Sequence, residues 1–159
     1  MPHLIVTPLS RLQEIAEAHE ANRIVTLINS ATLVERPRHV PEQDHLCLGF
    51  NDIVEPQEGM ILPAEQHVRD LFAFAQSWDR QSPMIIHCYA GVSRSTAGAY
   101  MTSLLLNPDQ DETELALELR RRAPTATPNA KLIAMADDIL GRNGKMVDAI
   151  RAIGRGAEC

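Results

Sequence analysis

Residues 84–96 read MIIHCYAGVSRST, and this stretch decides how the rest of the chain is interpreted. Cys88 ends a short apolar run, and Arg94 follows where a helical pattern begins. The loop between them contains small residues and one glycine, so its backbone N–H groups can turn inward at the start of a helix and form an anion-binding nest. The stretch therefore predicts a strand, a phosphate-binding loop and a helix in succession.

The chemistry expected at this loop is nucleophilic. The inward N–H groups, the helix dipole and Arg94 would all favour the thiolate form of Cys88. The guanidinium of Arg94 can hold two phosphoryl oxygens at once, which lysine cannot do. We expect His87 to point to the opposite side of the strand and order the loop from beneath. Ser95 follows at the helix start, where its hydroxyl can donate to the sulfur when the sulfur is the leaving group.

The segment HCYAGVSRS resembles the HC-x5-R-[ST] loop of the cysteine-dependent protein tyrosine phosphatases, and the compact chain is similar to their dual-specificity branch. The resemblance implies that Cys88 attacks phosphorus and that a cysteinyl-phosphate forms. It also implies that no metal or cofactor is required, because Arg94 and the loop N–H groups supply the charge stabilisation. The residues expected to bind phosphate are Tyr89, Ala90, Gly91, Val92, Ser93 and Arg94.

The same resemblance implies a general acid on a loop upstream of the nucleophile. Asp52 directly follows the apolar run 45–50, and we expect it to protonate the leaving oxygen and then to activate water. Asp44 and Glu55 compete for this role, because any polar loop contains solvated carboxylates. Further along the chain, Pro128-Asn129 fits the helix start that the family has after its phosphate loop.

The substrate class is narrowed by the loop composition. The five residues between Cys88 and Arg94 are neutral, whereas several phosphoinositide-selective relatives have basic residues there. We therefore expect a phosphorylated protein or peptide as partner, with phosphotyrosine first and phosphoserine or phosphothreonine left open. Two other functions also stay open: a phosphate-binding module without catalysis, and a rhodanese-like sulfurtransferase, which would not need Asp52.

Outside this loop, short runs rich in Ile, Val and Leu alternate with helical patterns. This alternation predicts one α/β domain over residues 1–153, with a central, mostly parallel sheet of four or five strands, a helical C-terminal half, and a flexible tail at 154–159. The expected strands are 3–7, 23–29, 45–50 and 84–87. The expected helices lie around 9–16, 68–78, 95–106, 111–122, 127–141 and 146–150.

Composition excludes several classes of partner. The 159 residues have 21 acidic and 15 basic side chains, a formal net charge of −6, and no broad positive field for nucleic acid. The cluster Arg120–Arg122 falls at a helix end, where basic residues complement the dipole. No signal peptide and no run of roughly 20 apolar residues is visible, so we expect a cytoplasmic protein that binds no membrane.

The three cysteines show no paired spacing, which argues against a zinc ribbon and a disulfide framework. Cys47 alternates with Leu46 and Leu48 in a predicted strand and is expected in the core. A disulfide between Cys47 and oxidised Cys88, as in some relatives of the family, is a minor alternative. Cys159 is expected to be an exposed tail thiol.

Overall fold

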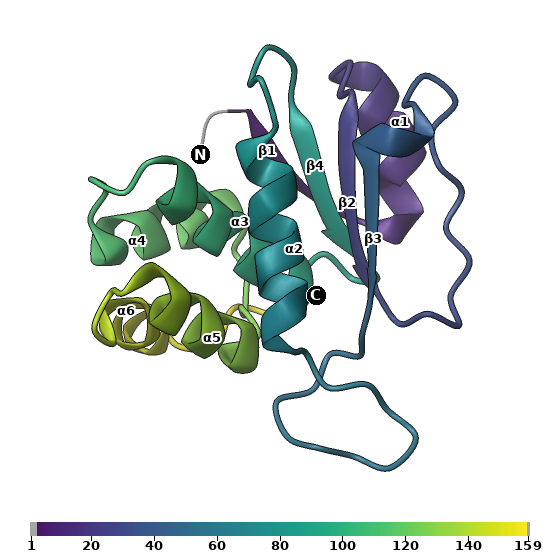
Figure 1. Ribbon diagram of the computed structural model, residues 1–159. Helices are drawn as coiled ribbons and strands as arrows, with labels where there is room; N and C mark the ends of the chain where they lie inside the picture. Colours follow the sequence, from purple (N-terminus) through teal and green to yellow (C-terminus); the bar gives the residue numbers. More distant parts are fainter. Residues whose placement is uncertain (1–2, 159) are drawn as a thin grey trace.

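Four short strands form one parallel sheet in the computed structural model, which describes residues 3–158. Their order across the sheet is β1-β4-β2-β3, so β4 is an interior strand and β3 is an edge strand (Figure 1). Each predicted strand is confirmed with its bounds within one residue. The strands are β1 (Leu4–Pro8), β2 (Arg23–Ile28), β3 (His45–Gly49) and β4 (Met84–Cys88).

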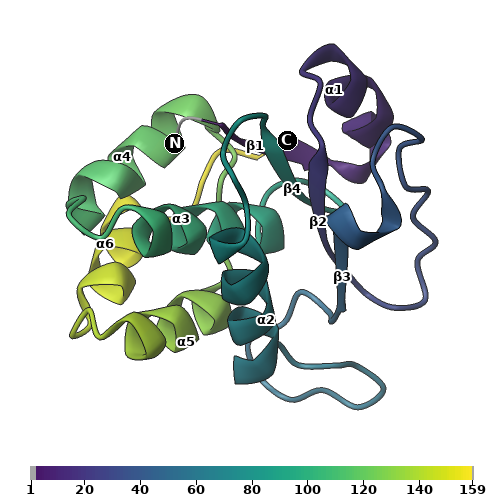
Figure 2. The same cartoon turned by 45° about the horizontal axis from the view of Figure 1, so that its top comes forward.

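Helices cover the two faces of the sheet unequally. A short 3-10 turn (Leu9–Arg11) leads into α1 (Leu12–Ala18), which covers one face. On the other face lie α2 (Glu65–Gln76) and α3 (Arg94–Leu106). The remaining helices pack outside α3, as Figures 1 and 2 show: α4 (Glu112–Arg122), α5 (Ala130–Leu140) and α6 (Lys145–Ile153). None of the helices over residues 3–158 has the length and apolarity to span a membrane.

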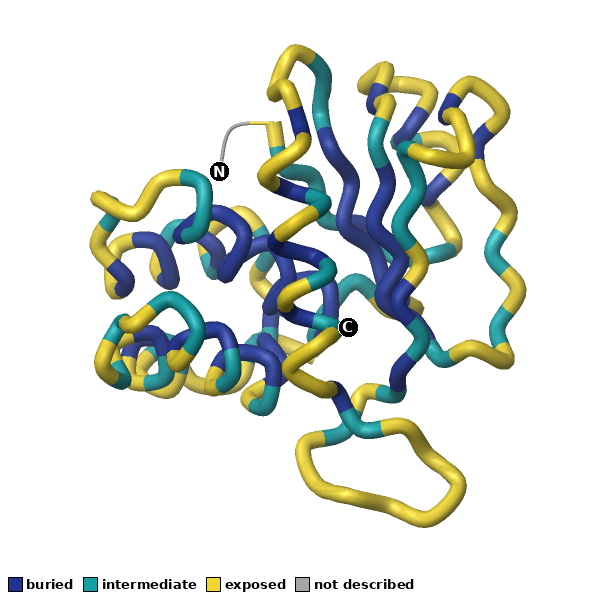
Figure 3. The backbone as a smooth tube through the Cα atoms, viewed as in Figure 1, coloured by how far each residue is buried: buried dark blue, intermediate teal, exposed yellow. Residues whose placement is uncertain are grey.

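The interior strands are buried on both sides, which explains their continuous apolar sequence. In β4, Met84 and Ile86 belong to the core beneath α2 and α3, while Ile85 faces the smaller core beneath α1. The tube in Figure 3 is accordingly dark blue along β2 and β4. The predicted core aromatics Phe72 and Trp78 are both buried. The predicted α/β domain with a helical C-terminal half is confirmed.

Capping residues set the helix boundaries after the phosphate loop. The Asp111 carboxylate accepts the Glu114 backbone N–H at 2.9 Å, as the sequence predicts for the start of α4. The prediction that α5 starts at Thr127-Pro128 is wrong by three residues, because Asn129 is the N-cap and its side chain accepts the Leu132 N–H. The helix ends at Gly141, which has a φ of 66°.

The prediction that Cys47 lies in the core is wrong, since Cys47 is exposed on edge strand β3. Its pairing partner Thr26 is in turn paired with His87, so all three side chains lie on one face and Cys88 points to the other. Two strand spacings, about 9–10 Å, also separate β3 from β4, beyond the reach of a disulfide. The Cys47–Cys88 bridge therefore does not fit the fold.

The residues after α6 contact the segment before α5. The Gly156 N–H donates to Thr127 Oγ1 at 3.0 Å, and the Ala157 N–H donates to the Pro124 carbonyl oxygen at 2.9 Å. The flexibility expected of residues 154–159 stays a prediction, and Cys159 lies outside the described residues.

Candidate active site

The nucleophile loop joins the end of β4 to the start of α3. Cys88 is 2% exposed, and its Sγ accepts the Gly91 backbone N–H at 3.3 Å and lies 3.1 Å from Ser95 Oγ. Gly91 has a φ of 72°, and a Cβ atom there would lie 2.8 Å from the Pro8 nitrogen. Only glycine can therefore make this turn and aim its N–H at the sulfur.

The carbonyl oxygens of the loop are bound by its surroundings. Four of them accept hydrogen bonds from residues outside the loop, and this arrangement turns the loop N–H groups inward, as an anion nest requires. The donors and acceptors are His87 Nδ1 to Cys88 O, Leu9 N to Tyr89 O, Thr127 N to Val92 O, and Asn129 N to Ser93 O. The fold thus holds the loop from β1, β4 and the segment before α5.

Arg94 is the first residue of α3 and is 7% exposed. Its Nη1 donates to the Phe50 carbonyl oxygen at 2.8 Å, while its buried Nε has no hydrogen-bond partner among the described residues. The Phe50 ring stacks on His67, with 4.8 Å between the centroids, which fixes the acceptor. A buried guanidinium donor without a partner costs free energy, which an oxyanion in the loop would offset.

Asp52 is fixed beside the nucleophile loop by two hydrogen bonds to one carboxylate oxygen. Ser93 Oγ donates to Asp52 Oδ1 at 2.7 Å, and Asn129 Nδ2 donates to the same oxygen at 2.9 Å. Asn129 Nδ2 also lies 3.1 Å from the Ile53 carbonyl oxygen. The sequence analysis did not include Asn129 among the site residues, although the Pro128-Asn129 helix start was the signal that could have found it.

The two competing carboxylates lie elsewhere. Asp44 precedes β3, whereas Cys88 ends β4, so the parallel strands place them at opposite edges of the sheet. Asp44 lies 3.7 Å from Arg23 Nε. Glu55 is exposed in the loop 54–61, which projects from the molecule in Figure 3. Asp52 is therefore the candidate acid that the fold brings to the loop of Cys88.

His87 lies beneath the loop on the side of the strand away from the Cys88 side chain. It is fully buried, its Nδ1 lies 3.1 Å from the Cys88 carbonyl oxygen, and its Nε2 lies 2.7 Å from Thr26 Oγ1. Burial lowers the pKa of His87 to about 4, so the imidazole is neutral near pH 7. This position agrees with the expectation that His87 orders the loop rather than moving protons.

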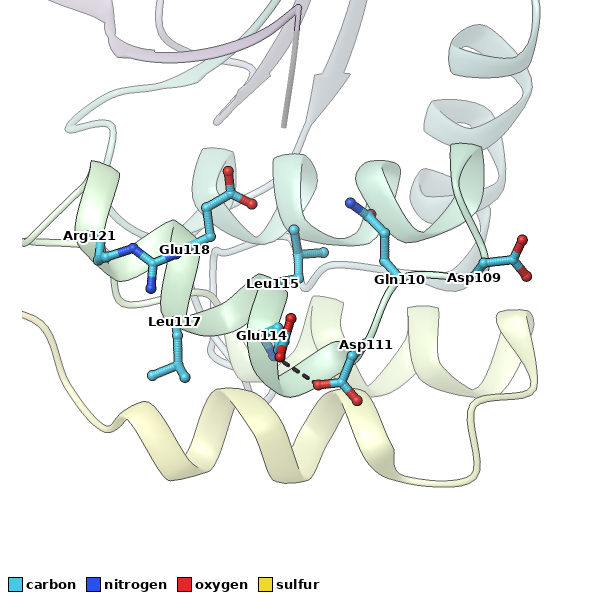
Figure 4. A pocket seen from close by; sticks show the side chains of 8 residues that line it. All are labelled: Asp109, Gln110, Asp111, Glu114, Leu115, Leu117, Glu118 and Arg121. Carbon is cyan, nitrogen blue, oxygen red and sulfur yellow. Dashed lines mark hydrogen bonds between the residues drawn. The ribbon is translucent and has the colours of Figure 1, made fainter.

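A surface depression along α4 lies apart from the loop of Cys88 (Figure 4). Four carboxylates and only one basic side chain line it, so it would repel a phosphate. Its lining residues are Asp109, Gln110, Asp111, Glu114, Leu115, Leu117, Glu118 and Arg121. This depression is therefore not a candidate phosphate site.

No family model and no curated protein matches the sequence. Solved structures do match over nearly the whole chain. Human DUSP28 aligns with a TM-score of 0.68 and 14% identity, over 89% of this chain and 94% of the other. The Yvh1 phosphatase domain from Chaetomium thermophilum aligns with a TM-score of 0.66 and 20% identity, over 92% and 95%.

A third structure is the human tyrosine phosphatase-like serine/threonine/tyrosine-interacting protein. It aligns with a TM-score of 0.69 and 16% identity, over 89% of this chain and 93% of the other. With the loop of Cys88, Arg94 and Asp52 already in place, these neighbours settle the fold: the chain has the fold of the dual-specificity phosphatases among the cysteine-dependent protein tyrosine phosphatases.

Proposed function

We propose that this protein is a phosphatase that hydrolyses phosphate monoesters on protein side chains, phosphotyrosine foremost, through a cysteinyl-phosphate. One observation carries the proposal: the unpartnered Nε of buried Arg94 lies in the loop whose Gly91 N–H is aimed at the sulfur of Cys88. A bound phosphoryl group would satisfy the guanidinium and place phosphorus against the nucleophile.

The proposed first step transfers the phosphoryl group to sulfur. The Cys88 thiolate attacks phosphorus while the bond from phosphorus to the ester oxygen breaks. Asp52 gives its proton to that oxygen, and the alcohol or phenol leaves. Arg94 and the loop N–H groups stabilise the charge on the other phosphoryl oxygens.

The proposed second step restores the enzyme. Asp52, now a carboxylate, takes a proton from water as the water attacks phosphorus and the S–P bond breaks. The sulfur leaves as a thiolate, and its neighbour Ser95, 3.1 Å away, donates a hydrogen bond to it. Inorganic phosphate is then released, and no external cofactor enters the balance.

A protein substrate is favoured by the surroundings of the loop. Tyr89 is 64% exposed beside the nucleophile, and Met60 and Ile61 are exposed on the loop that follows Asp52. Glu55 and Glu58 on that loop would repel the additional phosphates of an inositol headgroup. Apolar and acidic groups together suit a peptide segment that carries a single phosphate.

The proposal is tested with a panel of peptides that differ only in phosphotyrosine, phosphoserine or phosphothreonine. Wild type should release phosphate, fastest from phosphotyrosine. Cys88→Ser should show no turnover while still binding tungstate in calorimetry, because serine is a far weaker nucleophile in an unchanged nest. Substantial turnover by Cys88→Ser contradicts the covalent mechanism.

Two other outcomes support the alternatives. Tungstate binding by a wild type that turns over no peptide would support a phosphate-binding module, and one structural neighbour is itself named phosphatase-like. Sulfur transfer from thiosulfate without phosphate release would support a sulfurtransferase.

A further inference from the structure

A line of hydrogen bonds runs beneath the nucleophile loop, across β3, β2 and β4. Thr26 Oγ1 lies 2.7 Å from His45 Nε2 and 2.7 Å from His87 Nε2. His87 Nδ1 continues the line to the Cys88 carbonyl oxygen at 3.1 Å. These side chains lie on the face of the sheet opposite the Cys88 thiol, so none of them belongs to the phosphate nest.

The chemistry of each group fixes the direction of this line. A carbonyl oxygen only accepts, so His87 Nδ1 must carry the proton that bonds Cys88 O. Neutral His87 then has a bare lone pair at Nε2, and the Thr26 hydroxyl must donate to it. A hydroxyl has one proton, so Thr26 accepts from His45, whose Nε2 must be protonated. The donation runs from His45 to Thr26 to His87 to the loop.

Burial and charge keep this order in place. Thr26 is 2% exposed and His87 is fully buried, so no alternative partner in bulk water is at hand. Besides burial, His45 on β3 and Arg94 on α3 disfavour a cationic His87. Burial and Arg36 likewise lower the pKa of His45. The outer end of the line lies at the exposed edge of the sheet, where Cys47 Sγ is 3.3 Å from His45 Nε2.

We propose that Thr26 and His45 are positioning residues for the nucleophile, which hold His87 in the tautomer that donates to the Cys88 carbonyl oxygen. The inference deepens the proposed function and rests on it for its biological meaning, since Cys88 is the nucleophile of that reaction.

The consequence for Cys88 follows from peptide polarisation. A carbonyl oxygen that accepts a hydrogen bond makes the N–H of the same peptide group a stronger donor, and this N–H belongs to the anion nest. Without the Thr26 hydroxyl, the buried Nε2 of His87 has no donor, and the imidazole gains by moving its proton or turning. The nest then stabilises the thiolate of Cys88 less.

The test measures alkylation of Cys88 by iodoacetamide, read on the isolated peptide by mass spectrometry so that other thiols do not interfere. Thr26→Val removes the hydroxyl at nearly constant shape, and we expect the rate at pH 6 to fall roughly tenfold, the equivalent of one pH unit. At pH 9 the rates of variant and wild type should converge, because both sulfurs are then ionised. Thr26→Ser restores the hydroxyl and should restore the rate.

Thr7→Val is the matched control. Thr7 is paired with His87 from the other neighbouring strand and is equally buried, but its hydroxyl lies against the Pro8 carbonyl oxygen instead of His87. Its alkylation profile should follow wild type. A second pair probes the outer bond at a half-buried site: His45→Phe should lower the rate at pH 6 by a smaller factor, while His45→Gln, which keeps an N–H donor, should not.

Nitrogen NMR of the His87 imidazole gives the direct readout, with the proton on Nδ1 in wild type and Thr26→Ser and displaced in Thr26→Val. An unchanged rate and tautomer in Thr26→Val would overturn the inference, even if wild type proves to be an active phosphatase. An equal loss in Thr7→Val would also overturn it. The predicted alkylation pattern in a protein without turnover would support this inference and contradict the proposed function.

Discussion

At the scale of single residues, the orientation of Asp52 determines what the site can do. Ser93 and Asn129 both donate to Oδ1, so the proton for the leaving group would be carried on Oδ2. The carboxylate itself is exposed, on a segment of irregular backbone. These two hydrogen bonds are therefore what keeps the acid in position.

Asp52→Asn should cut the turnover of phosphotyrosine roughly 100-fold, because a phenol with a pKa near 10 needs a proton as it leaves. An activated aryl phosphate, whose leaving group needs no proton, should lose far less. Steady-state kinetics on both substrates measure the difference. Asp44→Asn is the control and should behave as wild type; a defect that depends on the leaving group in that variant would mean that Asp44 is the acid.

Asn129→Ser separates the two functions of this side chain. Serine can still cap α5 at the Leu132 N–H, but it is too short to reach Asp52. We expect an unfolding free energy within about 1 kcal/mol of wild type, together with a loss of phosphotyrosine turnover that resembles Asp52→Asn in kind. Wild-type kinetics in this variant would show that Ser93 alone positions the acid.

At the scale of elements, the helical cap is fastened by a buried carboxylate. Asp137 on α5 is 3% exposed and accepts the backbone N–H groups of Gly144, Met146 and Val147 at the start of α6. The charge also complements the helix dipole. An acidic side chain of one helix therefore caps the next.

Asp137→Ala should lower the unfolding free energy by about 2 kcal/mol, because it removes three charge-assisted bonds and leaves buried donors unpaired. Urea denaturation measures the loss. Asp148→Ala, which removes an exposed carboxylate from the first turn of the same helix, should cost only a few tenths. Equal losses in both variants would contradict the capping role.

Periodicity and capping signals predicted the strands, the helices and the succession of strand, loop and helix around Cys88, because these depend on neighbours in the sequence. Cys47 was misplaced because its exposure depends on β3 being an edge strand, and strand order is not encoded locally. Asn129 was missed for the same reason. Its contact with Asp52 joins segments 77 residues apart.

At the scale of the whole molecule, buried histidines make stability depend on pH. Burial lowers the pKa of His87 to about 4 from 6.5, and it also lowers the pKa of His45 and His67. Between these two pH values the unfolded chain binds a proton at His87 that the folded chain does not. The unfolding free energy therefore falls as pH falls through this window.

We expect His87 alone to contribute about 3 kcal/mol to this loss between pH 6.5 and 4. Denaturation at pH 7.5 and 4.5 should show a smaller pH dependence in His87→Gln than in wild type, since the titrating group is gone while carboxylates titrate in both. An identical pH dependence in the two proteins would contradict the buried, neutral state of His87.

The central claim is that Cys88 carries the phosphoryl group during turnover, and acid quenching tests it most directly. Asp52→Asn is mixed with a labelled phosphotyrosine peptide, quenched within the first turnover, and its peptides are analysed by mass spectrometry. The account predicts phosphate on the peptide that contains Cys88, approaching one group per chain, and none in Cys88→Ser. Phosphate release without any labelled Cys88 peptide, or a label on another residue, would contradict it.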